Sequence, residues 1–250
     1  MTDTMQSHYG REGIVERILK SLADDGVDID HLQVDHLGAL DEFHVGRRDA
    51  SERLLPLLGV GAGDAILDVG SGIGGPARFL ADRTGASVIG IDLTPEFVDA
   101  ATELTRRVGL ADRVSFQLAS GTDIPFDDDR FDGVTIAFGI RNVPDRARAL
   151  AEMARVTRPG GRVAILELSE PRSGLLGPLA RFHVHHVVPT LGGLLSGKKE
   201  YRYLQQSIAA FPPPETFAEL MRSAGLDVLE VIPLTFGVCT LYVGTPAEGS

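Results

Sequence analysis

The chain has 250 residues, of which 43% are hydrophobic and 24% are charged, a composition typical of a globular domain. Its formal net charge is −11, and no stripe of lysine and arginine is present, which argues against a nucleic-acid partner. The single cysteine excludes an internal disulfide bond and a cysteine-rich metal site, and we expect no metal ion.

The chain has no charged-then-apolar leader, and none of its uninterrupted apolar runs approaches the length needed to cross a bilayer. We therefore expect a cytoplasmic protein that lacks a transmembrane segment. Transient contact with a membrane surface, to reach an apolar substrate, stays open. The length suits one α/β domain with a helical cap.

Two helices are predicted before the first strand. Residues 11–23 place apolar side chains three and four positions apart, which predicts an amphipathic helix, and residues 49–58 resume that spacing. Between them, residues 35–46 form a mixed segment without a clear period.

The most informative stretch runs from Ala65 to Asp92. A short apolar strand leads into Asp68, four glycines follow within eight positions, and a helix over residues 76–83 precedes a strand over residues 87–91 that Asp92 closes. A strand, a glycine-rich turn, a helix and a second strand ending in an acid form the pattern that places a carboxylate on a ribose. The pattern predicts a ligand that contains a nucleoside.

Charge decides which nucleoside is favoured. The spacing of Gly70, Gly72 and Gly75 also fits the dinucleotide fingerprint, which alone is a weak signal. Asp68, two residues before the first glycine, would crowd a pyrophosphate at the helix N-terminus. S-adenosylmethionine carries an ammonium and a sulfonium and no phosphate, so we favour it over a nicotinamide or flavin dinucleotide.

The rest of the chain continues the alternation of strands and helices. Helices are predicted over residues 95–108, 145–157 and 215–224, and strands over residues 112–118, 131–138, 163–168, 227–232 and 237–243. This order predicts a doubly wound α/β fold. The loop after the strand at 131–138 lies where ligands bind in such sheets, which places Arg141 and Asn142 well for chemistry.

The motif DVGSGIGGPARFLA at 68–81, followed by GIDLTPEF at 90–97, resembles motif I and the second-strand acid of class I S-adenosylmethionine-dependent methyltransferases. The resemblance implies a seven-stranded, mostly parallel, Rossmann-like sheet whose last two strands are antiparallel. It also implies an N-terminal helical lid segment over residues 1–60 before a methyltransferase domain over residues 61–250. The cofactor-binding residues that it implies are Asp68, Gly70, Ser71, Gly72, Gly74, Asp92, Leu93, Ser120, Gly121, Thr122, Ala137 and Phe138.

Within this resemblance, one position departs from the family pattern and one segment adds a candidate residue. Ser120 aligns with a position that is usually Asp or Asn, where it meets the adenine amino group, and its hydroxyl is a shorter, neutral partner. The run DEFHVG at 41–46 resembles a segment that precedes motif I in bacterial small-molecule methyltransferases, which makes His44 a candidate active-site residue or a histidine that packs the lid.

From about Phe131 to the C-terminus the chain resembles the ubiquinone and menaquinone biosynthesis C-methyltransferases. The resemblance rests on FGIRNV at 138–143, RPGGRVAILELSEP at 158–171, FHVHHVVPTLGG at 182–193 and YRYLQQSIAAFP at 201–212. It implies methylation of a hydroquinone ring carbon, with residues 174–211 as a substrate-cap insertion. In that cap, Tyr201 and Tyr203 either face the ring of the substrate or pack beneath the lid.

Methylation of a hydroquinone requires a more electron-rich ring, which a base or a cation beside a ring hydroxyl supplies. Arg141 stays protonated, so we assign it the electrostatic role with Asn142 beside it; alternatively, Arg141 anchors an acidic residue at a strand end. His183, His185 and His186 are the available bases in this half, with His183 as the candidate catalytic residue; one of the three acts as a base or orients the substrate, or they pack or lie on the surface. A metal site would need a carboxylate that the neighbourhood lacks.

The sequence therefore predicts an S-adenosylmethionine-dependent methyltransferase that acts on a small aromatic or quinol acceptor, most simply at carbon, and releases S-adenosylhomocysteine. Two alternatives stay open: O- or N-methylation of a natural product, and a protein that binds S-adenosylmethionine without methylating. The apolar stretch at 175–195 lines an isoprenoid channel, packs as core, or forms the face of a homodimer.

Overall fold

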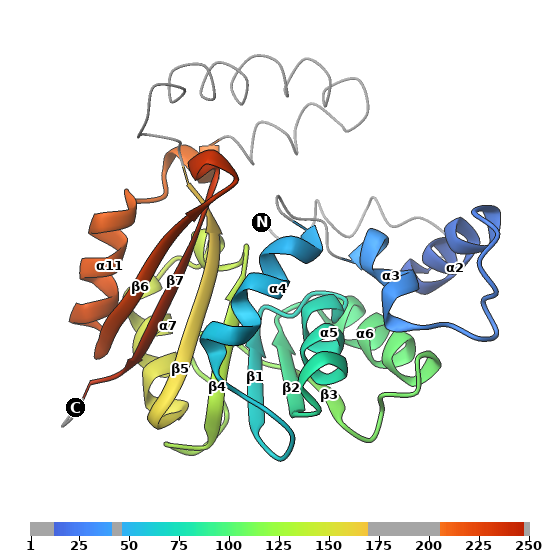
Figure 1. Cartoon of the computed structure of the whole chain (residues 1–250), viewed down its shortest axis with the longest axis horizontal. Coiled ribbons are helices and arrows are strands. Elements are labelled where there is room, and N and C mark those ends of the chain that lie inside the picture. The colour runs from blue at the N-terminus through green and yellow to red at the C-terminus, as the bar shows by residue number, and fades with distance from the viewer. Residues whose placement is uncertain (1–12, 42–46, 170–205, 248–250) are drawn as a thin grey trace.

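A computed structural model describes residues 13–41, 47–169 and 206–247. Seven strands form one sheet through the middle of the molecule (Figure 1). Their bounds are β1 (Ala65–Val69), β2 (Ser87–Asp92), β3 (Val114–Leu118), β4 (Phe131–Ala137), β5 (Thr157–Leu168), β6 (Leu226–Leu234) and β7 (Cys239–Pro246).

The strand order is β3-β2-β1-β4-β5-β7-β6. Strands β1 to β5 pair in parallel, whereas β7 runs antiparallel to both β5 and β6. The order reverses between β1 and β4, and the carboxyl ends of strands at such a switch point form the ligand crevice of doubly wound sheets. The predicted seven-stranded, mostly parallel sheet with a terminal antiparallel pair is confirmed.

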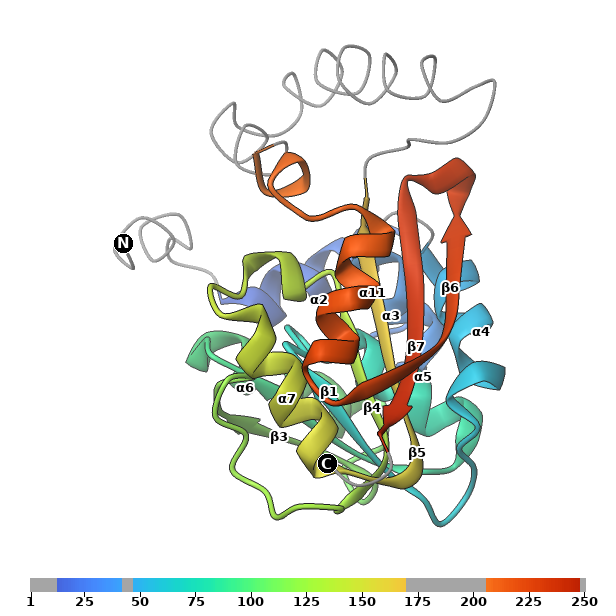
Figure 2. The ribbon, with the colours of Figure 1, turned by 90° about the vertical axis from the view of Figure 1, so that its left-hand side faces the viewer.

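Helices cover both faces of the sheet. Figure 2 shows α7 (Arg146–Val156) and α11 (Pro214–Ser223) on one face, where they bury a cluster that includes Met153, Phe217 and Tyr242. On the other face, α4 (Arg47–Leu58) and α5 (Gly75–Thr84) enclose a second apolar cluster with the sheet. Among the helices of the described ranges, none is both long enough and apolar enough to pass through a membrane.

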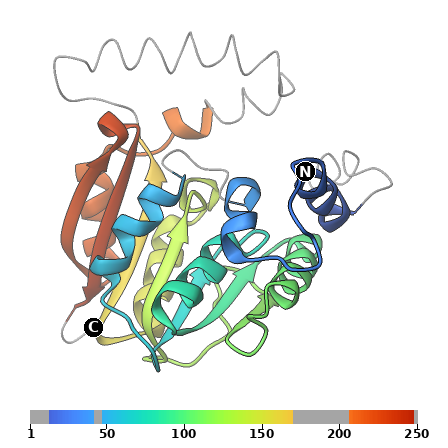
Figure 3. The ribbon, with the colours of Figure 1, turned by 45° about the vertical axis from the view of Figure 1, so that its right-hand side comes forward.

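The remaining N-terminal helices pack on the outside of this layer. Helix α3 (Val34–Asp41) contacts α5, and α2 (Ile14–Asp24) contacts α6 (Pro95–Arg107), as the dark-blue and green helices of Figure 3 show. Leu22 and Leu104 are buried in the small cluster between α2 and α6. The segment predicted as mixed over residues 35–46 is therefore helical as far as Asp41.

Strand β5 is longer than predicted, because it begins at Thr157 instead of Val163. Thr157 pairs with Phe131, and the register shifts between Phe131 and Gly133, so the strand starts with an irregular pair that spacing does not reveal. An ion pair of 2.6 Å between Arg158 Nη1 and Asp132 Oδ1 ties this extra length to β4.

The aromatic contacts of Phe217 generate a stability prediction. Phe217 is fully buried on α11, and its ring lies 4.8 Å from the ring centroids of both Phe211 and Tyr242. We expect Phe217→Ala to lower the free energy of unfolding by about 3–5 kcal/mol, because the side chain leaves a cavity. Leu229→Ala on the exposed side of β6 is the control, for which chemical denaturation should show little change. Equal losses in both variants would contradict this account of the core.

Candidate functional site

The turn between β1 and α5 crosses the carboxyl end of β2. The backbone N–H groups of Gly70 and Ser71 both donate to the Ile91 carbonyl, at 2.8 and 3.0 Å. Gly70, Gly72 and Gly74 have φ values of 67°, 53° and 85°, a left-handed conformation that side chains disfavour. The glycine pattern thus forms a backbone loop at the switch point of the sheet, as predicted.

The glycines of this loop differ in what a side chain would meet. A Cβ atom on Gly70 or Gly72 would have no atom within 4 Å, so these residues face open space. A Cβ on Gly74 would lie 2.5 Å from Phe116 Cζ, and one on Gly90 would lie 2.8 Å from Ser71 Oγ. Gly90, inside β2, was not predicted to shape the site; a glycine within a strand is the signal of close backbone approach.

Asp68 is a buried carboxylate with one hydrogen-bond partner among the described residues. Its Oδ1 accepts a hydrogen bond of 2.9 Å from Thr135 Oγ1, whereas Oδ2 accepts none from the described atoms. Burial raises the pKa of Asp68 to about 7; the hydrogen bond from Thr135 opposes this rise and the nearby Asp92 charge adds to it. A cation beside Oδ2 would favour the ionised form of this group.

A cavity of about 20 Å³ lies beside Asp68 on the α4 and α5 face of the sheet. Its other lining residues are Leu54, Pro76, Phe79, Leu80, Thr135, Ala137 and Leu166. Ala137, which was predicted to contact the cofactor, thus lines the same cavity as Asp68. Since the walls are mostly apolar, the described lining residues supply no positive charge beside Asp68.

Asp92 fixes the loop from the end of β2. Its Oδ2 accepts from the Gly72 N–H and its Oδ1 accepts from the Thr94 N–H, both at 2.9 Å. Each carboxylate oxygen keeps a further lone pair with which it can accept a hydroxyl proton. This geometry suits the predicted contact with a ribose.

Two large apolar side chains are exposed beside Asp92. Leu93 is 71% exposed after β2, and Leu118 is 54% exposed at the end of β3. The strand ends are adjacent, because the Ala119 N–H donates to the Asp92 carbonyl at 3.0 Å. An exposed apolar pair next to a ribose-binding acid suits the flat face of an adenine. Leu118 was missed in the sequence, where an apolar residue at a strand end carries no special signal.

The turn over residues 120–122 lies after β3. Ser120 Oγ hydrogen-bonds with Thr122 Oγ1 at 2.8 Å and accepts from the Thr122 N–H at 3.2 Å. A Cβ on Gly121 would lie 2.9 Å from Val69 Cγ1, so this turn packs closely on the end of β1. The hydroxyl of Ser120 is engaged within its own turn, and its contact with adenine stays a prediction.

These residues fit S-adenosylmethionine. The buried Oδ2 of Asp68 and the buried Oγ of Ser71 lack partners among the described atoms, which leaves an acceptor for a cation and a hydroxyl for a polar group. Asp92 is placed for a ribose, and the exposed leucines are placed for a purine. A pyrophosphate would meet the Asp68 charge instead.

Arg141 lies in the short 3-10 helix η1 (Ile140–Asn142) after β4, and it binds a carboxylate. Its Nη1 lies 2.6 Å from Glu167 Oε1, its backbone N–H donates to Oε2 at 3.0 Å, and Nη1 also donates to the Phe138 carbonyl. The structure thus has the geometry of the alternative in which Arg141 anchors an acidic strand-end residue. Asn142 is exposed at the end of η1.

Glu167 was not predicted as a site residue. It is fully buried at the end of β5, and burial raises its pKa although the Arg141 charge opposes the rise. An acid within an otherwise apolar strand was the available signal, since a buried charge needs a partner.

Four predicted residues lie outside the described part of the chain: His44, His183, Tyr201 and Tyr203. Within the described ranges, no three or more His, Cys, Asp and Glu side chains gather in a group that could hold a metal ion.

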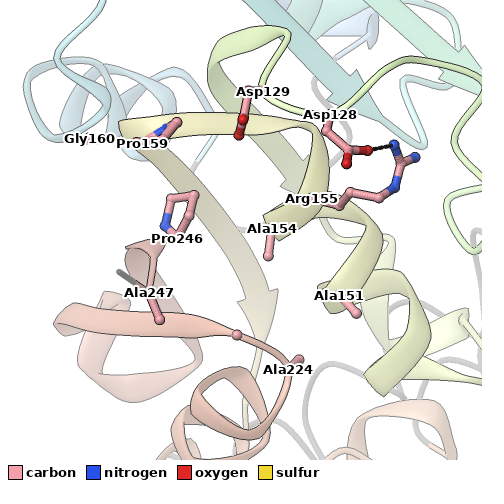
Figure 4. Close-up of a pocket in the computed structure, with 11 residues that line it drawn as sticks. Asp128, Asp129, Ala151, Ala154, Arg155, Pro159, Gly160, Ala224, Pro246 and Ala247 are labelled. Atoms are coloured by element: carbon pink, nitrogen blue, oxygen red, sulfur yellow. Dashed lines mark hydrogen bonds and ion pairs between the residues drawn. The ribbon is translucent and has the colours of Figure 1, made fainter. Parts of the chain in front are cut away.

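A cavity of about 640 Å³ lies elsewhere, between the end of α7 and the C-terminal part of β7 (Figure 4). The side chain of Arg155 at its edge is already bound, to Asp128 at 2.7 Å and to Glu152 at 2.8 Å. This cavity does not include the glycine-rich loop, Asp68 or Asp92.

The open space at Gly72 predicts a selective loss of binding. Gly72→Ala and Gly109→Ala both place a side chain at positive φ, with no atom within 4 Å in either case. We expect similar small losses of stability from both, but at least a tenfold weaker affinity for S-adenosylmethionine only in Gly72→Ala, because its Cβ enters the ligand side of the loop. Isothermal titration calorimetry measures both affinities, and equal affinities would contradict the assigned loop.

The state of Asp68 predicts a pH dependence of cofactor binding. Below its pKa of about 7 the carboxyl is neutral, and binding of a cation must release the proton. The affinity for S-adenosylmethionine should therefore fall by up to about tenfold per pH unit from pH 7 toward pH 5.5. We expect Asp68→Asn to bind more weakly at pH 8 and to lose this slope, whereas Asp123→Asn, an exposed acid, should keep it.

The apoprotein should show the opposite trend in stability. The raised pKa of Asp68 adds stability below pH 4, which is lost as the pH rises toward 7. Asp68→Asn should accordingly raise the melting temperature of the apoprotein at pH 8. A lower melting temperature at that pH would mean that the carboxylate has a partner after all.

Curated relatives are similar over most of their length. The chain is 44% identical over 181 residues to the ubiquinone/menaquinone biosynthesis C-methyltransferase UbiE of Geotalea daltonii, which covers 72% of this chain and 77% of the relative. It is 43% identical to the demethylmenaquinone methyltransferase of Thermus thermophilus, over 72% of this chain and 81% of that protein.

Solved structures share the fold at low identity. A SAM-dependent methyltransferase from Aquifex aeolicus matches with a TM-score of 0.60 and 21% identity, over 85% of this chain and 98% of that chain. Phosphoethanolamine N-methyltransferase 2 of Haemonchus contortus, in complex with S-adenosyl-L-methionine, matches with a TM-score of 0.64 and 19% identity, over 84% of this chain and 55% of that chain.

A sequence model of the ubiE/COQ5 methyltransferase family matches residues 39–246, which include every strand of the sheet and the whole glycine-rich loop. Together with the loop, Asp68 and Asp92, this match identifies the cofactor as S-adenosylmethionine. The chain belongs to the ubiE/COQ5 methyltransferase family and is an S-adenosylmethionine-dependent methyltransferase.

Proposed function

We propose that this enzyme methylates a ring carbon of a hydroquinone. The observation that carries the proposal is the sequence identity of 44% and 43%, over 181 residues each, to a ubiquinone/menaquinone biosynthesis C-methyltransferase and to a demethylmenaquinone methyltransferase. The motifs FGIRNV and LELSEP contribute the ion pair between Arg141 and Glu167, which lies at the ligand edge of the sheet. O- or N-methylation of another small molecule is the alternative that the fold alone leaves open.

The residues of the loop have the task of binding and orienting the donor. Bound S-adenosylmethionine would supply the methyl group: the ring carbon would bond to it in line with the breaking methyl–sulfur bond, S-adenosylhomocysteine would leave, and the ring carbon would lose its proton to restore the aromatic ring. Asp68 is the group that would hold the positive end of the donor, and Asp92 the group that would hold its ribose. Leu93 and Leu118 would cover the base and exclude water from it.

On the acceptor side, a ring hydroxyl has to lose or share its proton so that the ring becomes nucleophilic. Arg141 cannot take that proton, because a guanidinium stays protonated. His183 and His44 are the proposed candidates for the base, and Tyr201 and Tyr203 are proposed to contact the ring. Residues 174–211 are proposed as the substrate cap, and residues 1–60 as a lid segment.

A homodimer in the cytoplasm is the proposed state of the enzyme. Sedimentation velocity of the purified chain tests the oligomeric state, since monomer and dimer differ twofold in mass.

The decisive experiment incubates the enzyme with S-adenosylmethionine and a panel of acceptors: demethylmenaquinol, benzoquinols, simple phenols and amines. We expect S-adenosylhomocysteine to form only with a quinol, and we expect nuclear magnetic resonance of the product to show the new methyl group on a ring carbon. The Asp68→Asn variant serves as a control for turnover that depends on the donor site.

A methyl group found on oxygen or nitrogen would replace the proposal with its alternative. Binding of S-adenosylmethionine without turnover of any quinol would contradict the proposed acceptor.

A further inference from the structure

We propose that Glu167 is a positioning residue for methyl transfer. Through its ion pair with Arg141, Glu167 holds the turn after β4 in a strained conformation. That conformation places Phe138 on the α4 and α5 face of the sheet, the face that carries Asp68. This inference rests on the proposed function, because it concerns the same site. The turn is defined here as residues 138–142.

Strain in the turn is concentrated at Phe138. Its φ of 56° lies in the left-handed region, which a bulky side chain rarely adopts. Residues in such conformations persist only where their surroundings over-determine them, and they gather at active sites and ligand clamps.

The conformation changes the face to which Phe138 turns. Successive side chains of a strand point to opposite faces, yet Ala137 and Phe138 both pack against the apolar cluster on the α4 and α5 face. Ala137 lines the cavity beside Asp68. The positive φ at the end of β4 thus keeps the Phe138 ring on the side of the sheet that carries the donor site.

Glu167 connects the turn to the end of β5. Its Oε2 accepts from the Arg141 N–H at 3.0 Å, and its Oε1 accepts from Arg141 Nη1 at 2.6 Å and from the Leu168 N–H at 2.8 Å. Arg141 Nη1 in turn donates to the carbonyl of Phe138. One buried carboxylate therefore fixes the C-terminal part of the turn directly and the strained residue through Arg141.

A second arginine holds the turn from the other side. Arg146 Nη2 donates to the Arg141 carbonyl at 2.8 Å, and Arg146 Nε donates to the Ile140 carbonyl at 3.3 Å. Its guanidinium lies 5.5 Å from the ring centroid of Phe211, the last residue of the proposed substrate cap. These contacts restrain η1, but none of them reaches Phe138, whose carbonyl is held by the Glu167–Arg141 pair.

Because it is buried, the Glu167–Arg141 ion pair is not explained by a contribution to folding stability alone. Taking two charges out of water costs free energy, and well-packed apolar side chains of similar volume often replace a buried pair without loss. Glu167 is fully buried on the same face as Phe217 and Tyr242, where an apolar residue would pack. In addition, Arg141 Nε is buried and donates to no described atom.

The first test is Glu167→Gln, which keeps the shape of the side chain but removes its charge. We expect kcat to fall at least tenfold at saturating substrates, while the Kd for S-adenosylmethionine, measured by calorimetry, changes less than threefold. The matched control is Glu152→Gln, which breaks the ion pair with Arg155 in α7 and should leave kcat unchanged. An unchanged kcat per folded Glu167→Gln molecule, with only a lower melting temperature, would overturn the proposal.

A second variant keeps the test decisive if Glu167→Gln does not fold. Arg141→Lys retains the positive charge of the pair, but the lysine side chain is one atom shorter, so its ammonium does not reach the position of Nη1 from which both Glu167 and the Phe138 carbonyl are bound. We expect a folded protein whose kcat is at least fivefold lower with an unchanged Kd for S-adenosylmethionine. A wild-type kcat in Arg141→Lys would overturn the positioning role.

Hydrogen exchange separates this proposal from the proposed function. Amide exchange across residues 138–142, followed by mass spectrometry without any acceptor, should accelerate at least tenfold in Arg141→Lys and stay unchanged in Glu152→Gln. Unchanged exchange in Arg141→Lys would overturn the inference about the turn. If exchange accelerates but the wild-type enzyme turns over no quinol, the proposed acceptor is wrong and the inference about the turn stands.

Discussion

The backbone crossing between β1 and α5 is the constraint on which the donor site depends. The chain has to pass over the end of β2 without a side chain in the way, and two of its N–H groups share the Ile91 carbonyl as it does so. Gly74 and Gly90 lack the side chains that would clash with Phe116, whereas Gly70 and Gly72 face open space, where a ligand can approach the backbone. The Gly72 N–H donates a hydrogen bond to Asp92, so the last residue of β2 also fixes the loop.

Local patterns explain why this half of the site could be predicted from the sequence. Strand period, glycine spacing and an acid at a strand end are properties of neighbouring residues, so they indicated Asp68, Asp92 and the loop before any tertiary contact was known. Gly90 escaped notice because the side chains that approach it, Phe116 of β3 and Ser71 of the loop, come from distant parts of the sequence. The same reasoning fixed the order of helices and strands, but the early start of β5 depends on an irregular pairing with Phe131.

The acceptor half was harder to predict, because its decisive contact joins residues 26 positions apart. The sequence placed Arg141 at the ligand edge of the sheet and allowed two tasks for it, an electrostatic one and the anchoring of an acid. The acid within the apolar part of β5 signals that Glu167 needs a partner, but nothing local identifies that partner as Arg141, which lies 26 positions earlier. The positive φ of Phe138 could not be predicted either, because such a conformation is normally signalled by glycine or asparagine and not by phenylalanine.

Two fully buried carboxylates lie on opposite faces of the same sheet, and their partners differ in a way that separates structure from ligand binding. Glu167 accepts hydrogen bonds from two backbone N–H groups and a guanidinium, so the protein satisfies it. Among the described atoms, Asp68 accepts one hydrogen bond, from the Thr135 hydroxyl, so ionising its carboxyl group costs free energy unless a cation binds beside it. Strand β4 and the turn after it touch both groups, through Thr135 on one face and Arg141 on the other. One short segment therefore contacts both buried acids, Asp68 on one face of the sheet and Glu167 on the other, at the edge where the strands of the switch point end.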